Sequence, residues 1–342
     1  MINGHGDDRY LFNYPVNADF SSNVYYEGFS EGLQEHLTGR LQKLNNYPEA
    51  NAQSLQHALA DWHQLSAPQV LVTNGATEAF YLVAHAFRRR SVTVAIPAFA
   101  EYEDACQAND LEISFISYDE LNADTRCWSD LVFFGNPNNP TGAILSVDTV
   151  REILLSHPQT TFVIDEAYVD FTEAAISMVP FLDQHPNLVI IKSLTKTYAI
   201  PGLRLGYILS SEAMIAKLLS AKMPWSVNTL AIEAGLYITR HSDQLQLPIR
   251  ALRRDTAELI AQLSAVDGIR IRDTHTNFFL CDTTAGTAAD LKQYLLAQHG
   301  LLIRDAANFR SLTPQHFRIA TQRPADNHSL VKGISAWISS FS

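Results

Sequence analysis

Residues 187–206 read NLVIIKSLTKTYAIPGLRLG, an apolar run of β-forming residues that leads directly into a turn carrying Lys196. A run without polar alternation is typical of a strand that helices cover on both faces. Open α/β sheets bind ligands at the carboxyl ends of their strands, which is where Lys196 would lie. A lysine partly removed from water beside other cations is a usable amine nucleophile. Taken alone, however, Lys196 would more simply be a surface lysine.

Similar β-rich runs alternate with helical patterns on both sides of this stretch, which is the signature of an α/β fold. We therefore expect a mostly parallel seven-stranded sheet, in which one antiparallel strand would be compatible with the pattern. Residues 77–90 (TEAFYLVAHAFRRR) predict a helix, since three terminal arginines suit a helix C-terminus. The runs are QVLV (69–72), SVTVAI (91–96), LEISFIS (111–117), DLVFF (130–134), TFVIDE (161–166), NLVIIKS (187–193) and RLGYILS (204–210).

The rest of the chain predicts further parts around this sheet. Residues 212–223 and about 229–263 have helical patterns, the second long enough to bridge two domains. TNFFLCD, a helix near 288–298, LLIRDA and HFRIAT predict a smaller α+β unit. We expect an N-terminal arm (1–44) that joins the small domain, a large domain (45–228), and an interdomain helix with a small C-terminal domain (229–342).

Composition restricts the possible partners. The 342 residues are 46% hydrophobic and 18% charged, which is typical of a globular protein of about two domains. The 25 basic and 36 acidic residues give a net charge of -11, which disfavours binding to nucleic acid and to anionic membranes. The cysteines are Cys106, Cys127 and Cys281, with no CxxC, so neither a disulfide scaffold nor a metal site is expected. The N-terminus lacks signal-peptide features and no apolar stretch nears ~18 residues, so we expect a cytoplasmic protein without membrane contacts.

The lysine segment resembles the SxTKxxxxxGxRxG motif of the fold-type I, class I/II aminotransferases, which depend on pyridoxal 5′-phosphate (PLP). Four other segments match this family in the same order along the chain. The resemblance covers nearly the whole sequence and implies the fold-type I architecture, PLP as cofactor, and Lys196 as its attachment point. The four segments are Asn74-Gly75-Ala76-Thr77, GNPNNPTG (135–142), Asp165-Glu-Ala-Tyr168 and Phe317-Arg318-Ile.

The phosphate of the cofactor would bind where the first strand ends. Gly75, Ala76 and Thr77 open a helix there, so their backbone N–H groups would face an anion. The resemblance implies that Ser193 and Arg204 contact the same phosphate, Arg204 with a fork of donors. An ordinary helix cap would explain the NGAT segment if it stood alone.

The resemblance also assigns residues to the cofactor ring. Asp165, at the end of a predicted strand, would pair with the pyridine nitrogen, so that the ring can act as an electron sink. Asn139 and Tyr168 would hydrogen-bond the phenolic oxygen, and Tyr102 would stack on the ring. Lys196, Asp165 and Tyr168 would then be the catalytic residues. In isolation, the same residue types would be a helix cap, a turn asparagine and core tyrosines.

Two matched residues point beyond the cofactor. Arg318 matches an arginine that grips the substrate carboxylate with two parallel hydrogen bonds, although a surface salt bridge is its simpler role. Tyr47 matches a tyrosine that reaches the cofactor phosphate of the neighbouring subunit, although it could instead pack at a hinge. The resemblance therefore implies a homodimer with shared active sites.

The two ends of the chain resemble the threonine-phosphate decarboxylase branch of the family. Gly4-His5-Gly6, DFSSN (19–23) and LLIRDAANF (301–309) match its HGGN, DFSxN and LIRxxxNF segments. The departures are Asp7-Asp8 in place of Gly-Asn, and Val24-Tyr25-Tyr26 in place of a sequence that contains Asn-Pro. The histidinol-phosphate aminotransferase branch, or another amino-acid aminotransferase, is the alternative.

The branch implies decarboxylation of L-threonine O-3-phosphate to an aminopropanol phosphate, a step of cobalamin-type biosynthesis. The bond on the substrate Cα that stands perpendicular to the cofactor ring is the one that breaks, so substrate orientation decides between decarboxylation and transamination. Arg304, His5 and Asn23 are expected to hold the substrate phosphate and set that orientation. Arg304 could instead form a structural ion pair.

Overall fold

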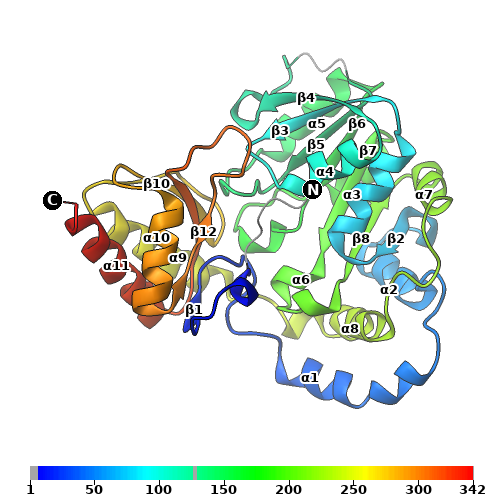
Figure 1. Ribbon diagram of the computed structural model, residues 1–342. Coiled ribbons are helices and arrows are strands. Elements are labelled where there is room, and N and C mark those ends of the chain that lie inside the picture. Colours follow the sequence, from blue (N-terminus) through cyan, green and yellow to red (C-terminus); the bar gives the residue numbers. More distant parts are fainter. Residues whose placement is uncertain (1–6, 126–128, 342) are drawn as a thin grey trace.

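The computed structural model describes residues 7–125 and 129–341, which form a large unit around one sheet and a smaller unit beside it (Figure 1). The large sheet has seven strands in the order β2-β8-β7-β6-β5-β3-β4. Strand β8 runs antiparallel to β2 and β7, and the other neighbours are parallel. Each strand coincides with a predicted run, which confirms the expected sheet. The strands are β2 (Val70–Thr73), β3 (Ser91–Ile96), β4 (Glu112–Ser117), β5 (Leu131–Gly135), β6 (Thr161–Asp165), β7 (Leu188–Ser193) and β8 (Gly206–Ser210).

Helices cover both faces of this sheet, which explains why its strands are apolar without alternation. Along β7, Leu188 and Ile190 belong to one core, whereas Val189 and Ile191 belong to the other. Functional side chains are therefore held at the strand ends and not on the faces of the sheet. The first core lies under α2 (Gln53–His63), α5 (Val147–Ser156) and α8 (Thr229–Arg240), and the second under α3 (Gly75–Ala86), α4 (Ala100–Ala108) and α7 (Glu212–Leu219).

The smaller unit is a four-stranded antiparallel sheet in the order β12-β13-β10-β9, with three helices that share its core. An N-terminal strand, β1 (Ala18–Asp19), joins this unit by pairing in parallel with β11 (Leu301–Leu302). The α+β organisation expected from the sequence is therefore present. Its other elements are α9 (Ile249–Ser264), β9 (Ile269–Ile271), β10 (Phe278–Thr283), α10 (Ala288–His299), β12 (Arg304–Asp305), β13 (His316–Ala320) and α11 (Pro324–Ser339).

The single long helix expected over about 229–263 is wrong, because two helices occupy this stretch. Helix α8 ends at Arg240, and α9 begins only after Pro248. Helix α8 contributes to the core of the large sheet, and α1 (Glu31–Thr38) packs against α8. The expected domain boundaries after residues 44 and 228 therefore stay a proposal. Among the described residues, no helix is both long and apolar enough to cross a membrane.

Candidate active site

A cavity of about 380 Å³ lies where the strand ends of the large sheet meet the smaller unit. A hollow of about 90 Å³ shares several of its lining residues and reaches down to the end of β6. Residues that are far apart in the sequence therefore surround one space, as expected for a ligand site at this edge of an α/β sheet. The predicted residues that line it are Asn23, Ala76, Thr77, Asn139, Asp165, Tyr168, Ser193, Lys196, Arg204, Arg304 and Arg318.

Lys196 lies in a short helical turn, α6 (Leu194–Thr197), that follows β7 directly. Its backbone carbonyl accepts a hydrogen bond from the N–H of Tyr25, which ties the turn to the N-terminal segment. Burial, assisted by the positive charges of Arg318 and Arg204, lowers the pKa of the Lys196 amine to about 8. The amine is therefore partly neutral, and hence nucleophilic, near physiological pH.

The start of α3 forms an anion cradle with Arg204. Gly75 has a φ of +71°, and a Cβ added there would lie 2.6 Å from Nη2 of Arg204. Only glycine allows this approach of backbone and guanidinium. The first N–H groups of a helix have no partner within the helix and favour negative charge. Ser193 also lines this end of the site, and its hydroxyl lies 2.8 Å from that of Thr195. The helix N–H groups, the Arg204 guanidinium and the Ser193 hydroxyl, together with the space that a Cβ at Gly75 would fill, fit the phosphate of PLP.

Asp165 ends β6 at the bottom of the hollow. Its Oδ1 accepts the N–H of Ala167 at 2.9 Å, and its Oδ2 accepts the hydroxyl of Tyr102 at 2.6 Å. Burial raises the pKa of the Asp165 carboxyl to about 6, and the two hydrogen bonds oppose this rise. The carboxylate is thus held in one orientation at a depth where a protonated ring nitrogen would be its natural partner.

Arg318 connects the two units at the mouth of the hollow. Its Nη1 donates to Oδ1 of Asn139 at 2.5 Å, and its Nη2 donates to the carbonyl of Ser21 at 2.6 Å. Burial lowers the pKa of Arg318 to about 10. The Nε atom of Arg318 is buried and lacks a hydrogen-bond partner among the described residues.

Arg304 is the direct cross-strand neighbour of Arg318. Strands β12 and β13 pair so that the Cα atoms of Arg304 and Arg318 lie opposite each other, and both side chains are buried and line the cavity. Arg304 donates to Oδ1 of Asn308 at 2.7 Å, and its guanidinium lies over the ring of Phe309. Like charges directly opposite in a sheet are destabilising, so this pair indicates a site for anionic ligands.

The family model of the class I and II aminotransferases matches residues 17–334. The chain belongs to this family. It is 40% identical to a solved L-threonine-O-3-phosphate decarboxylase from Porphyromonas gingivalis, with a TM-score of 0.92 and coverage of 94% of this chain and 99% of that one. It is 31% identical over 334 residues to the threonine-phosphate decarboxylase of Salmonella typhimurium, covering 92% of this chain and 90% of that protein. It is also 30% identical over 327 residues to histidinol-phosphate aminotransferase 2 of Pasteurella multocida, covering 92% and 88%.

These relatives confirm the family, the fold class and the enzymatic nature expected from the sequence. They also confirm PLP as the cofactor of the family, and one structural neighbour, a histidinol-phosphate aminotransferase from Sinorhizobium meliloti, was solved in complex with pyridoxal-5′-phosphate. Both branches that the sequence left open are represented among them. The similarity to the decarboxylases extends over most of the chain, as does the similarity to the aminotransferases.

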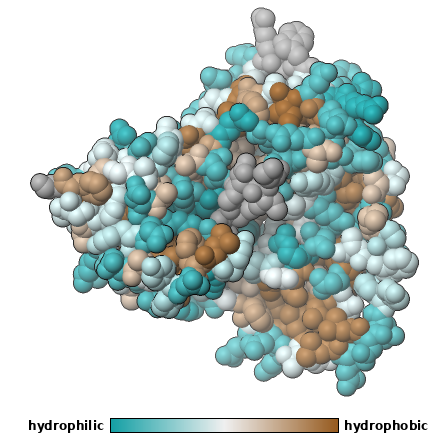
Figure 2. Space-filling view, in the orientation of Figure 1, coloured by the Kyte–Doolittle hydropathy of each residue, from teal (hydrophilic) through white to brown (hydrophobic). Residues whose placement is uncertain are grey.

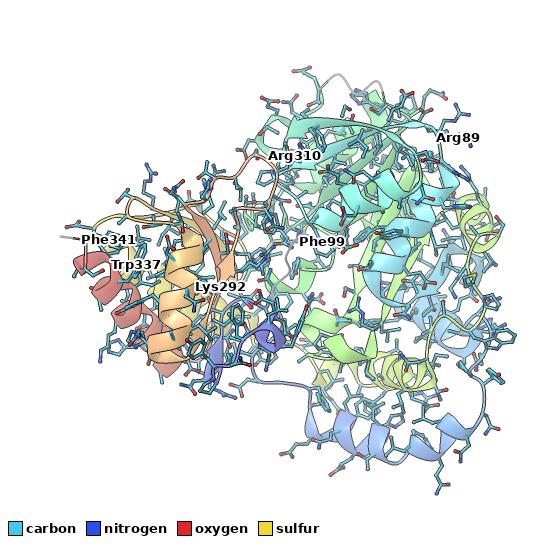
Figure 3. The ribbon with its side chains drawn as sticks, in the orientation of Figure 1. Arg89, Phe99, Lys292, Arg310, Trp337 and Phe341 are labelled. Atoms are coloured by element: carbon cyan, nitrogen blue, oxygen red, sulfur yellow. The ribbon has the colours of Figure 1, made fainter. Side chains whose placement is uncertain are left out.

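One predicted position in this aminotransferase-family site needs correction. The structure does not bring Tyr102 to the cavity, because its ring is fully buried, with its centroid 5.7 Å from that of Phe133. Phe99 lines both the cavity and the hollow instead, and it lies where the two units face each other (Figure 3). Sequence reasoning missed Phe99, although its place just after β3 put it nearer the strand end than Tyr102.

The N-terminal segment contributes one predicted residue that can be placed. Asn23 is 2% exposed and lines the cavity beside Tyr168, whose hydroxyl its side chain approaches closely enough to oppose the rise in the pKa of that tyrosine. Neither amide atom makes a hydrogen bond of good geometry among the described residues, so a bound ligand could complete the bonding of this buried amide. Asp7, which departs from the branch pattern, also lines the cavity. His5 lies outside the described residues.

Tyr47 does not reach the cavity of its own chain. It is 87% exposed, and its ring lies 5.7 Å from that of Trp225, which is itself 53% exposed. If Tyr47 contacts a cofactor, that cofactor must therefore be bound by a second chain, and this role stays a proposal.

Proposed function

We propose that this chain decarboxylates L-threonine O-3-phosphate, releasing CO₂ and leaving an aminopropanol phosphate for cobalamin-type biosynthesis. The observation that carries the proposal is the pair of buried arginines, Arg304 and Arg318, opposite each other beside Lys196. Phosphothreonine has two anionic groups on neighbouring carbons, and two guanidinium groups match that spacing of charge. The similarity to two threonine-phosphate decarboxylases supports the same substrate.

The two arginines would act by orientation. Arg318 would offer donors that its own chain leaves unused, Nε–H among them, to the substrate carboxylate, while Arg304 and the buried amide of Asn23 would offer donors to the phosphate. Fixing both anionic groups fixes the rotation of the substrate about Cα, and this rotation selects the bond that breaks. Burial makes each charge-assisted contact stronger than it would be in water.

The cofactor would sit between the phosphate cradle at Gly75, Thr77 and Arg204 and the carboxylate of Asp165. When bound, PLP supplies an electron sink for the pair of electrons left on Cα as CO₂ departs. Lys196 would be the residue that holds the cofactor covalently, and its Nζ would return a proton to the substrate Cα. Phe99 lines both the cavity and the hollow, so Phe99, and not Tyr102, would be the aromatic side chain in contact with the ring.

The second candidate is transamination of histidinol phosphate, which the 30% identity to the Pasteurella enzyme favours. One experiment separates the two reactions. The PLP-loaded protein is given phosphothreonine and assayed for CO₂, and in parallel it is given histidinol phosphate with 2-oxoglutarate and assayed for glutamate. We expect CO₂ from phosphothreonine and little from unphosphorylated threonine. Glutamate formation without CO₂ release would replace the decarboxylase proposal with the aminotransferase.

We also propose a homodimer that shares its active sites. Figure 2 shows hydrophobic residues gathered at the end of the molecule where α1 and α8 lie. Exposed Leu41, Leu44, Tyr47, Met223 and Trp225 come from segments that flank these helices. Patches of this kind mark protein contacts. A dimeric mass in solution is expected, and a fully active monomer would overturn the proposal.

We further propose a cytoplasmic location, since the free Cys106 and Cys281 are buried thiols.

A further inference from the structure

The contact between Tyr102 and Asp165 lies beneath the cavity and has no role in the proposed function. The hydroxyl of Tyr102 donates to Oδ2 of Asp165 at 2.6 Å, and both side chains are buried. This distance lies within the 2.5–2.7 Å range of hydrogen bonds from an O–H group to an ionised carboxylate, which are stronger than hydrogen bonds between neutral groups. We propose that Tyr102 is a positioning residue that holds Asp165 as an anion, in the orientation needed to bind the ring nitrogen of the cofactor.

The surroundings of Tyr102 fix its hydroxyl on this carboxylate. Its ring lies nearly parallel to that of Phe133, at an interplanar angle of 16°, and meets the edge of Phe80 at a centroid distance of 4.8 Å. Gly135 leaves the necessary space, since a Cβ there would lie 3.2 Å from the hydroxyl oxygen. The tyrosine is thus clamped by packing, and its hydroxyl is the one polar atom of a side chain that is 1% exposed.

The two hydrogen bonds to Asp165 leave room for a third partner. A carboxylate offers about four lone-pair sites on its two oxygens. Ala167 occupies one site on Oδ1 and Tyr102 one site on Oδ2, so each oxygen retains one site. Burial favours the neutral acid at this depth, and donation by Tyr102 opposes that tendency by stabilising the charged form. Without Tyr102, Asp165 would more readily take the proton that the ring nitrogen should hold.

The inference rests on the proposed PLP site, but not on the identity of the substrate. It is tested with Tyr102→Phe, which keeps the ring and removes only the hydroxyl. The matched control is Tyr207→Phe, because Tyr207 is equally buried and its hydroxyl lies 2.8 Å from Nε2 of His63, away from the cavity. The measurements are the dissociation constant of PLP from each protein and the ¹⁵N chemical shift of the ring nitrogen in bound, ¹⁵N-labelled PLP.

We expect Tyr102→Phe to raise the PLP dissociation constant about tenfold or more, because the loss of one charge-assisted hydrogen bond weakens binding by about this factor. We also expect its ring nitrogen to shift toward the unprotonated value, whereas Tyr207→Phe leaves both quantities unchanged. A side chain with a purely packing role would leave the ¹⁵N shift unmoved.

Unchanged affinity and ¹⁵N shift in folded Tyr102→Phe would overturn the inference. Wild-type protein that takes up no PLP would overturn the cofactor site together with this inference. Wild-type protein that binds PLP but releases no CO₂ would overturn the proposed reaction alone.

Discussion

On one side of the cavity, the candidate functional residues lie at or near the strand ends of the seven-stranded sheet, whereas on the other they come from short strands, a loop and an N-terminal segment. The first side, the sheet wall, comprises Gly75–Thr77, Asn139, Asp165, Tyr168, Ser193, Lys196 and Arg204. The second side, the arginine wall, comprises Ser21–Asn23, Arg304, Asn308 and Arg318. The sheet wall is fixed by strands sandwiched between helices. The arginine wall is fixed mainly by contacts between residues distant in sequence, such as Arg318 with Ser21.

This difference in how the two walls are fixed corresponds to two different tasks in the proposed function. The sheet wall would supply the chemistry that a PLP enzyme needs, and its residues lie where the fold itself places them. The arginine wall would supply charge for one class of substrate, and its residues lie outside the seven-stranded sheet. Substitutions on the sheet wall should therefore abolish turnover, whereas substitutions on the arginine wall should change substrate preference.

The largest effect is expected at Lys196. Lys196→Ala should lower kcat by about a thousandfold or more, since the amine both holds the cofactor and moves a proton. Borohydride reduction of the wild-type holoenzyme, followed by peptide mapping, should place the reduced cofactor on Lys196. The control is Lys217→Ala, because Lys217 lies over the ring of Phe87, away from the cavity. Reduced cofactor on a different lysine would contradict the assignment of the sheet wall.

Lys196 should also lower the free energy of unfolding of the apoprotein. Burial lowers the Lys196 pKa from 10.5 to about 8, so below pH 8 the protonated amine is buried at a cost. Between pH 8 and 10.5 the folded protein has lost this proton while the unfolded chain retains it, so wild-type stability rises with pH. Lys196→Met removes the cost and should stabilise the apoprotein at pH 7 by roughly 2–3 kcal/mol.

Urea unfolding of both apoproteins from pH 7 to 10.5 measures this difference. The advantage of Lys196→Met should shrink as pH rises through the window. Asp165 does not interfere, because its raised pKa of about 6 acts at lower pH. A stability difference that stays constant across the window would show that charge burial is not its cause.

On the arginine wall, Arg304→Ala should lower kcat/KM for phosphothreonine at least about tenfold, since a charge-assisted contact contributes roughly 1.5–3 kcal/mol. A loss in kcat would mean that the phosphate sets which bond on Cα stands perpendicular to the ring, whereas a loss in KM alone would mean uniform binding. The matched control is Arg270→Ala, because Arg270 pairs with Asp282 on the exposed face of the same small sheet. Equal losses in the two variants would contradict a phosphate contact at Arg304.

The sheet wall was largely predictable from the sequence, whereas on the arginine wall the resemblance named Asn23, Arg304 and Arg318 but did not show how they meet. Continuous apolar runs identified the strands, and their ends gave the positions of Asp165 and Lys196. The run LLIRDA, by contrast, contains two strands, since β11 pairs with β1 and β12 pairs with β13. The opposition of Arg304 and Arg318 depends on that register, which no local pattern encodes. Phe99 was missed because only the packing of α4 shows that Tyr102 faces the sheet core.

The smallest effect is expected at Arg310, which lies at the tip of the loop that reaches from the small unit toward the large one (Figure 3). A substitution there tests whether this residue holds the two walls together. Its guanidinium pairs with Glu103 of α4 at 2.6 and 3.0 Å and lies 4.0 Å from the ring centroid of Phe115. Asn308, which accepts from Arg304, is two residues away. Because Arg310 is half exposed, the pair should contribute at most about 1 kcal/mol. Arg310→Met should therefore raise KM for phosphothreonine by roughly two- to fivefold with kcat unchanged.

The charge-swapped double variant, Arg310→Glu with Glu103→Arg, should restore part of the lost affinity, and 0.5 M salt should reduce the effect because exposed pairs are screened. A merely structural contribution of the loop would lower thermal stability without rescue by the swap. If Arg310→Met instead lowers kcat and leaves KM unchanged, the loop acts on the sheet wall, and the division of tasks between the two walls does not hold.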